Sequence, residues 1–241
     1  MTKASDILER ALVAMRSEPR IGPRFKPAAL TIDGEGAVTI EGEVDNVAAK
    51  RLALERLATV PGVDGIVDRL RVKPANRMSD DGILDHLRKA YYQEPAFHQL
   101  KLKERVSGQL TLVRDAPDAR GELQIEVDDG VVVLNGSVPG LASKRLAGVL
   151  AWWVPGTRDV VNGIAVEPVE EDAPIQIEEA VKIVFEKDPL LDASQIRTGV
   201  RQRVVRLTGR VRTEAERDAA EWDAWYVFGV DNVLNELEVG S

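Results

Sequence analysis

Residues 131–166 read VVVLNGSVPGLASKRLAGVLAWWVPGTRDVVNGIAV, and this pattern occurs three times in the chain. The segments Val38 to Val72 and Val205 to Val239 both align on Val132 to Val166 without a gap. A pattern that recurs along a chain is the sequence signature of a modular protein. We therefore divide the 241 residues into three modules, 1–74, 77–168 and 172–241.

Two sets of glycines recur at matched positions of the three copies. The first set interrupts an alternating strand pattern, where the lack of a side chain lets another segment approach closely. The second set follows a helical segment, and glycine in this place typically ends a helix. The first set is Gly42, Gly136 and Gly209, and the second is Gly62, Gly156 and Gly229. We expect both sets to have structural roles.

Each module is expected to begin with a helix. Helix-capping signals precede three apolar segments, at Ser5-Asp6, Ser79 to Asp81 and Asp172 to Pro174, and apolar residues then recur at helical spacing. Each helix is expected to end before a proline, because the residue that precedes proline is disfavoured in the helical conformation. These prolines are Pro19, Pro95 and Pro189.

The rest of each module predicts a β-hairpin, an alanine-rich helix and a last strand. In the third module the hairpin turn is expected at Gly199. The predicted fold class is α+β: three tandem α-β-β-α-β modules, each with two helices packed on a three-stranded mixed sheet. The second module is about twenty residues longer than the others, and its insertion near 97–121 alternates around Gly108, which predicts an added hairpin.

The composition is that of a globular protein. Apolar residues make up 44% of the chain, charged residues 30%, and the net charge is −8. Because there is no cysteine, disulfides and thiolate metal sites are excluded. The N-terminal segment is charged throughout, and no segment approaches the roughly 18 apolar residues of a membrane span. We expect a cytoplasmic location, with peripheral membrane attachment left open.

Three features of the repeat resemble the BON domain family (bacterial OsmY and nodulation). They are a Val-x-x-x-Gly-x-Val strand, an alanine-rich helix ending in Val-x-Gly, and the closing V-x-N-x-[LI]-x-V of Val160 to Val166 and Val233 to Val239. In the first copy Asp68 stands at the asparagine position. The resemblance implies a non-enzymatic module that attaches to membrane phospholipid, with links to osmotic and envelope stress. Because some relatives bind small ions, potassium among them, an ion-responsive or small-ligand module is the alternative.

No catalytic constellation recurs in the three copies. The only histidines are His86 and His98, and neither belongs to a cluster with the spacing of metal ligands. No nucleophile, base and orienting group recur together, and no glycine-rich phosphate-binding motif is present. We therefore expect no enzymatic activity, no metal site and no cofactor.

Charges of opposite sign face one another on the sheet surface away from the helices. Module 3 sets Arg206, Arg210 and Arg212 against two glutamates of the last strand, and module 1 has the signs reversed. Arginines alone would suggest a surface for anions or nucleic acid. The reversal favours pairing across neighbouring strands, so we expect no nucleic-acid partner and keep an anion site as the weaker alternative. The same face of module 2 lacks charge, which predicts that it is covered.

All four tryptophans lie on the second helix of modules 2 and 3. They are Trp152, Trp153, Trp222 and Trp225, with Tyr226 beside them. The first copy has no aromatic residue at these positions, so a module folds without one. Aromatic clusters outside a core mark packing between modules or contact with lipid headgroups. We expect these residues to bind membrane lipid or an envelope-associated partner, with packing between modules or self-association as the alternatives.

Overall fold

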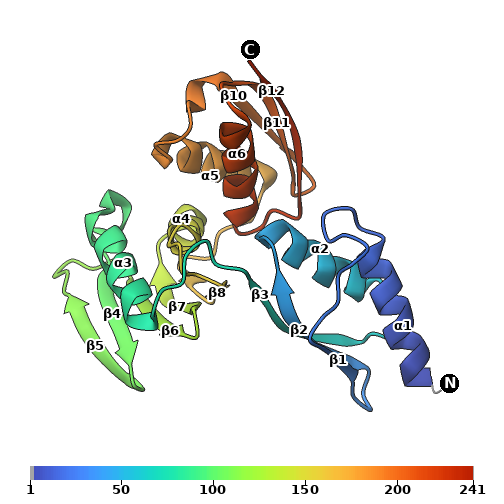
Figure 1. Ribbon diagram of the computed structural model, residues 1–241. Coiled ribbons are helices and arrows are strands. Elements are labelled where there is room, and N and C mark those ends of the chain that lie inside the picture. Colours follow the sequence, from blue (N-terminus) through green and yellow to red (C-terminus); the bar gives the residue numbers. More distant parts are fainter. Residues whose placement is uncertain (1–2, 241) are drawn as a thin grey trace. The chain divides into compact units, whose positions relative to one another are not determined.

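The computed structural model describes residues 3–240, which form two compact units divided at Lys73 and Pro74. The first unit is module 1, and the second contains modules 2 and 3. Helices and mixed sheets alternate along the chain, so the predicted α+β class is confirmed (Figure 1).

Module 1 has the predicted order of elements. They are α1 (Lys3–Arg16), β1 (Ala29–Ile32), β2 (Ala37–Val44), α2 (Val47–Ala58) and β3 (Gly65–Val72). The central strand β2 pairs antiparallel with β1 and parallel with β3. Its buried residues Val38, Ile40 and Val44 share one face, because side chains alternate along a strand.

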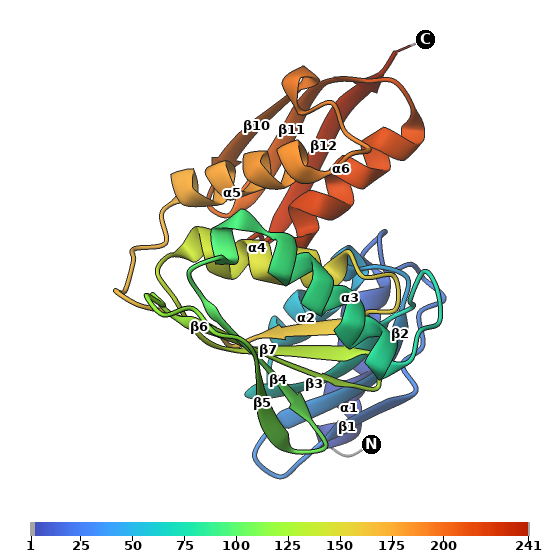
Figure 2. The same ribbon diagram turned by 90° about the vertical axis from the view of Figure 1, so that its left-hand side faces the viewer.

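Module 3 repeats this topology. Its elements are α5 (Pro174–Lys187), the short 3-10 helix η2 (Ala193–Gln195), β10 (Ile196–Arg201), β11 (Val204–Val211), α6 (Glu214–Tyr226) and β12 (Asn232–Val239). Strand β11 lies between antiparallel β10 and parallel β12. Figure 2 shows α5 and α6 side by side on one face of this sheet.

Module 2 carries a larger sheet than the other two. Its elements are α3 (Asp80–Gln93), the short 3-10 helix η1 (Pro95–Phe97), β4 (Lys101–Val106), β5 (Gln109–Arg114), β6 (Glu122–Asp128), β7 (Val131–Val138), α4 (Leu141–Trp152), β8 (Asp159–Asn162) and β9 (Ala165–Val166). The insertion forms the predicted hairpin, β4–β5, and β4 adds to β6 in parallel. The strand order is β5-β4-β6-β7-β8, with β9 also pairing with β7. The three strands of the repeat thus become six, because the predicted hairpin adds two and the last strand is divided into β8 and β9.

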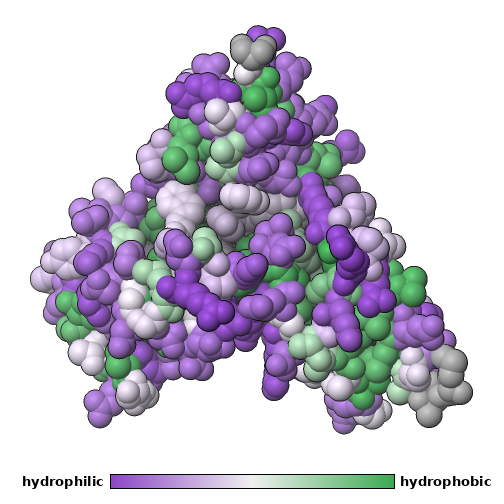
Figure 3. All heavy atoms as spheres, in the orientation of Figure 1, coloured by the Kyte–Doolittle hydropathy of each residue, from purple (hydrophilic) through white to green (hydrophobic). Residues whose placement is uncertain are grey.

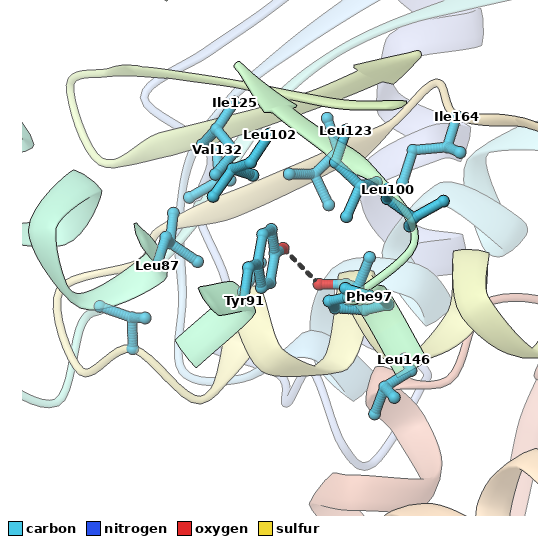
Figure 4. Packing of buried hydrophobic residues seen from close by; sticks show 14 of the residues in the cluster. Leu87, Tyr91, Phe97, Leu100, Leu102, Leu123, Ile125, Val132, Leu146 and Ile164 are labelled. Atoms are coloured by element: carbon cyan, nitrogen blue, oxygen red, sulfur yellow. Dashed lines mark hydrogen bonds between the residues drawn. The ribbon is translucent and has the colours of Figure 1, made fainter. Parts of the chain in front are cut away.

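The core of module 2 lies between this sheet and helices α3 and α4 (Figure 4). Tyr91 is fully buried in it, and its hydroxyl donates to the carbonyl of Ala147 at 2.6 Å. The ring of Phe97 stands edge-on to Tyr91, with centroids 5.3 Å apart. Burial raises the pKa of Tyr91. The bond satisfies the one polar atom that this ring brings into the core, as buried hydroxyls require.

The closing asparagine of the repeat ties the last strand of a module to its second helix. In module 2, Asn162 Nδ2 donates to the carbonyl of Lys144 at 2.8 Å, and in module 3 Asn235 makes the equivalent bond to α6 at 3.0 Å. In module 1, Asp68 instead pairs with the ammonium of Lys50 at 2.9 Å. Lys50 and Lys144 are equivalent positions of the second helix. Asp68 therefore joins the last strand of module 1 to its second helix by an ion pair, where the asparagines use a hydrogen bond.

Two local expectations are wrong. Helix α1 already includes Lys3, so Ser5 and Asp6 lie inside it rather than before it, and Asp6 pairs with Arg10 one turn later at 3.1 Å. Gly199 lies within β10 and not in the turn. The turn of module 3 is at Gln202-Arg203, where both φ angles are positive (48° and 63°), as a tight type I′ hairpin turn needs.

The glycines after the second helices do not all share one conformation. Gly62 and Gly229 have φ angles of 95° and 96°, in the left-handed region. Gly156 has no positive φ. A Cβ there would lie 2.5 Å from Cβ of Met78, so this glycine makes room for a side chain.

Candidate functional site at the junction of modules 2 and 3

Helix α4 of module 2 lies against both helices of module 3, α5 and α6. The two modules thus form one compact unit, and three of the predicted aromatic residues, Trp152, Trp153 and Tyr226, make contacts across their junction. The segment that joins the modules also binds α4, because the carboxylate of Glu170 accepts from the backbone N–H of Leu141 at 2.8 Å. An acidic side chain at a helix N-terminus satisfies a free N–H and complements the helix dipole.

Arg145 is the central polar residue of this junction. It is only 1% exposed, and its Nε donates to the carbonyl of Phe228 in module 3 at 2.9 Å. A second guanidinium nitrogen donates to the carboxylate of Asp172. On the same helix, the ammonium of Lys144 lies 4.7 Å from the ring centroid of Phe228. Removing one partner of such a buried pair leaves an uncompensated charge, so these contacts hold the modules together.

Trp153, directly after α4, and Asp223 of α6 form a second polar contact of this junction. Trp153 Nε1 donates to one carboxylate oxygen of Asp223 at 2.8 Å. The side chain is 3% exposed, and its other oxygen accepts no hydrogen bond within the described residues. Burial raises the pKa of Asp223 to about 8; the bond from Trp153 opposes the shift, and nearby Asp188 adds to it. The carboxyl is therefore mostly protonated at neutral pH.

The remaining aromatic residues differ in their exposure. Trp152 stacks on Tyr226 across the junction, with centroids 5.7 Å apart and planes 10° from parallel. Trp225 is buried, with 1% exposed, whereas Trp222, one turn before Tyr226, is 48% exposed. Burial raises the pKa of Tyr226 to about 12. The structure thus brings Trp152, Trp153 and Tyr226 together between modules and leaves Trp222 as the indole open to solvent.

Sequence reasoning missed the polar part of the junction. Asp223 stands where the second copy has Leu150 and the first copy has Arg56, so the change from an apolar to an acidic residue between the second and third copies was the available signal. Arg145 gave no such signal, because the first copy has Arg51 at the equivalent position. A third contact, from Lys187 Nζ to Glu94 at 3.0 Å, also joins residues that no periodicity relates.

The arginines of module 3 pair with carboxylates as their alternating signs suggested. Arg206 bonds Glu236 at 2.6 Å, and Arg210 lies 3.5 Å from Glu238 across neighbouring strands. Arg212 instead bonds a first-turn carboxylate of α6 at 2.8 Å. All three arginines are exposed, and a surface pair of this kind contributes at most about 1 kcal/mol.

The uncharged face of module 2 differs from expectation. Val161 on β8 is 49% exposed, and Asn135 on β7 is also exposed, so the prediction that this face is covered is wrong. Small and polar side chains such as Asn135 tolerate water, and apolar atoms form more than half of a typical folded surface, so an uncharged face can remain exposed.

Comparison with known families gives a match over most of the chain. The sequence model of the BON domain matches residues 14–74, 101–168 and 176–241. The chain belongs to the BON domain family. The BON domain is a non-catalytic binding domain, and here it is present in three copies. The resemblance first suggested by the repeat is thereby confirmed.

Solved structures add little to this assignment. The C-terminal domain of CdsD, a structural protein of the type III secretion system of Chlamydia trachomatis, matches with 12% identity, a TM-score of 0.25 and full coverage of both chains. A second CdsD structure matches with 13% identity and a TM-score of 0.24, covering 98% of this chain and 94% of that one. Matches with such low scores establish neither the fold nor the function of this chain. No curated protein matches the sequence.

Between Lys3 and Gly240, no group of three or more His, Cys, Asp or Glu side chains is arranged to hold a metal ion. Among the helices of that same range, none is long and apolar enough to cross a membrane.

Proposed function

We propose that this protein is a non-enzymatic binding protein whose modules 2 and 3 attach, as one unit, to membrane phospholipid. Membership of the BON family supports this function and a role in osmotic or envelope stress. The observation that carries the proposal is Trp222, an indole left 48% exposed beside an otherwise packed aromatic cluster. Tryptophan is favoured at membrane interfaces because its ring is apolar and its N–H is polar. The proposed location is cytoplasmic and peripheral to the membrane, with an envelope-associated protein as the alternative partner of this surface.

Replacing Trp222 with alanine is expected to weaken binding to phospholipid vesicles about tenfold or more. Burying one large aromatic side chain contributes roughly 1.5–3 kcal/mol, and 1.4 kcal/mol is a factor of ten in affinity. Co-sedimentation with vesicles of phosphatidylcholine and phosphatidylglycerol measures the change. Leu234→Ala is the matched control, because Leu234 is 45% exposed in the same module but lies on β12.

Tryptophan emission gives a second readout of the same proposal. The other three indoles are buried or partly buried, so a blue shift on adding vesicles should come mainly from Trp222 and disappear in Trp222→Phe. If Trp222→Ala and Trp222→Phe both bind vesicles as the unmodified protein does, phospholipid does not contact this surface. Binding of a membrane-extracted protein that depends on Trp222 would then favour the alternative partner.

A hollow in module 1 favours small-ligand binding as a second candidate function. Its volume is about 420 Å³, and it lies between the loop after α1 and the start of α2. Arg20, Arg24 and Lys26 line it together with Glu43 and Asp45. The loop is held by Arg16, whose Nε donates to the carbonyl of Phe25 at 2.7 Å. Three cations at one hollow fit an anionic small molecule better than potassium.

Inorganic phosphate is therefore expected to raise the melting temperature of the full chain by a few degrees, and potassium chloride at equal ionic strength is not. A ligand that binds only the folded state stabilises it in proportion to the logarithm of its concentration. The double variant Arg24→Ala, Lys26→Ala should lose the response to phosphate. An equal rise with both salts, or a rise that the double variant retains, would contradict this second function.

A further inference from the structure

Strand β5 ends the sheet of module 2 and leaves one edge open. Within residues 3–240, β4 is the only strand that pairs with it. The N–H and C=O groups on the outer side of such a strand are free to pair with another chain. Because the other modules have no β4–β5 hairpin, this edge is particular to the insertion.

The other edge strands carry features that discourage pairing. Charged side chains and short length are the usual protections of a sheet edge. Strands β3, β10 and β12 each carry two or more charged residues, while β1, β8 and β9 have at most four residues. Strand β5 reads QLTLVR over six residues and is uncharged from Gln109 to Val113.

The single charge of β5 is drawn into its own module. The guanidinium of Arg114 donates to the carbonyls of Tyr92 at 3.2 Å and Leu100 at 3.3 Å. It also lies 5.2 Å from the ring centroid of Tyr92. Arg114 therefore does not stand at the open edge to repel an approaching chain.

One face of β5 is apolar and electrically balanced. Leu110 and Leu112 are 39% and 49% exposed, and hydrophobic residues reach the surface where Figure 1 draws β5 (Figure 3). They lie opposite Arg105 and Lys103 of β4. Those two cations pair with Glu126 and Glu122 of β6, at 3.6 Å and 2.5 Å. The leucines are thus bordered by neutralised pairs.

We propose that β5 pairs antiparallel with β5 of a second copy of this chain, with Thr111 at the twofold axis. In that register Leu110 lies opposite Leu112 of the second copy, so four leucines form one cluster on one face. An alternating strand keeps its faces matched only when even-numbered positions meet even-numbered ones. Centring on Thr111 meets this condition and keeps both leucines in the regular part of the strand, because the register of β4 and β5 shifts only after Leu112.

Charge favours a second copy over a different protein. The paired surface would hold no like charges, since residues 109–113 have none and the bordering cations are neutralised. A basic or acidic partner strand would find no opposite charge to meet on β5. The inference is independent of the proposed membrane attachment, which rests on Trp222.

Cysteine cross-linking of the full chain tests the register directly. The protein has no cysteine, so a single introduced thiol reports on one position. Directly opposed residues of antiparallel strands have Cα atoms about 4.5–5.5 Å apart, within the range that a disulfide spans. Thr111→Cys should therefore form a covalent dimer under mild oxidation. Gln109→Cys is the matched control, because in this register it lies opposite Val113 of the second copy and should not cross-link.

Sedimentation velocity over a range of concentrations tests the association itself. The unmodified chain should dimerise, and Leu112→Lys should weaken the dimer at least tenfold, whereas Leu234→Lys on β12 should not. Circular dichroism confirms that each variant is folded. A chain that stays monomeric, or equal cross-linking of the two cysteine variants, would overturn the proposal. So would a Leu112→Lys variant that loses vesicle binding with unchanged mass, because the leucines would then contact lipid.

Discussion

Gly136→Val is expected to destabilise the middle module by roughly 3–5 kcal/mol, from backbone strain and overpacking together. Gly136 has a φ of 101°, which a branched residue rarely adopts, and an added Cβ would lie 2.2 Å from the carbonyl oxygen of Glu122 on β6. Because that oxygen belongs to a paired neighbouring strand, it cannot move without breaking the sheet. Such a loss is a large part of the total stability of a domain.

Module 3 supplies both a repetition and a control for this prediction. Gly209 has a φ of 127°, and its Cβ would lie 2.1 Å from the carbonyl oxygen of Gln195, so Gly209→Val should be similarly harmful. Gly199 in the same sheet has no positive φ and open space around it. Gly199→Val should therefore be neutral or stabilising, since valine favours strands. Calorimetry and urea unfolding measure all three variants, and equal melting temperatures would show that the shared glycine does not mark a close approach.

Raising the pH from about 4 to about 8 is expected to weaken the junction of modules 2 and 3 through Asp223. Its pKa rises from 3.8 to about 8 on burial. Between pH 4 and pH 8 the folded state keeps a proton on Asp223 that the unfolded state has lost, so a rise in pH lowers the free energy of unfolding. The stabilising contribution of Asp223 is fully present below pH 4 and is lost as the pH rises through 8. The largest slope from one group is about 1.4 kcal/mol per pH unit.

Asp223→Asn separates this effect from other titrations. The amide oxygen can still accept the bond from Trp153 Nε1, but the side chain cannot ionise. Urea unfolding at pH 5.5 and pH 8.5 should show a smaller loss of stability for the variant than for the unmodified protein. Parallel profiles of the two proteins would mean that Asp223 does not titrate between these values. Other ionisable groups change the stability of both proteins alike, so the difference between the two pH profiles reports on Asp223.

The strands and helices could be predicted well because their signals are local. Apolar residues recur at every second position of β2 and β11, and side chains alternate along any strand. Helices α3 and α5 end just before the residue that precedes a proline, as expected, although α1 already ends at Arg16, three residues before Pro19. The insertion alternates on both sides of Gly108, which placed the β4–β5 hairpin correctly. The turn at Gln202-Arg203 was missed, because it lacks the glycine that usually marks positive φ angles.

By itself the sequence determined a modular α+β protein with three BON copies and the charge pairs between the neighbouring strands of module 3. Each of these depends on spacing within one module, which repetition makes visible. Only the tertiary structure decided that α4 docks on α5 and α6, that Trp153 meets Asp223, and that Trp222 alone among the tryptophans stays largely exposed. These contacts join side chains that lie far apart in the chain and belong to different modules. No periodicity relates such residues, so their meeting depends on how whole helices pack.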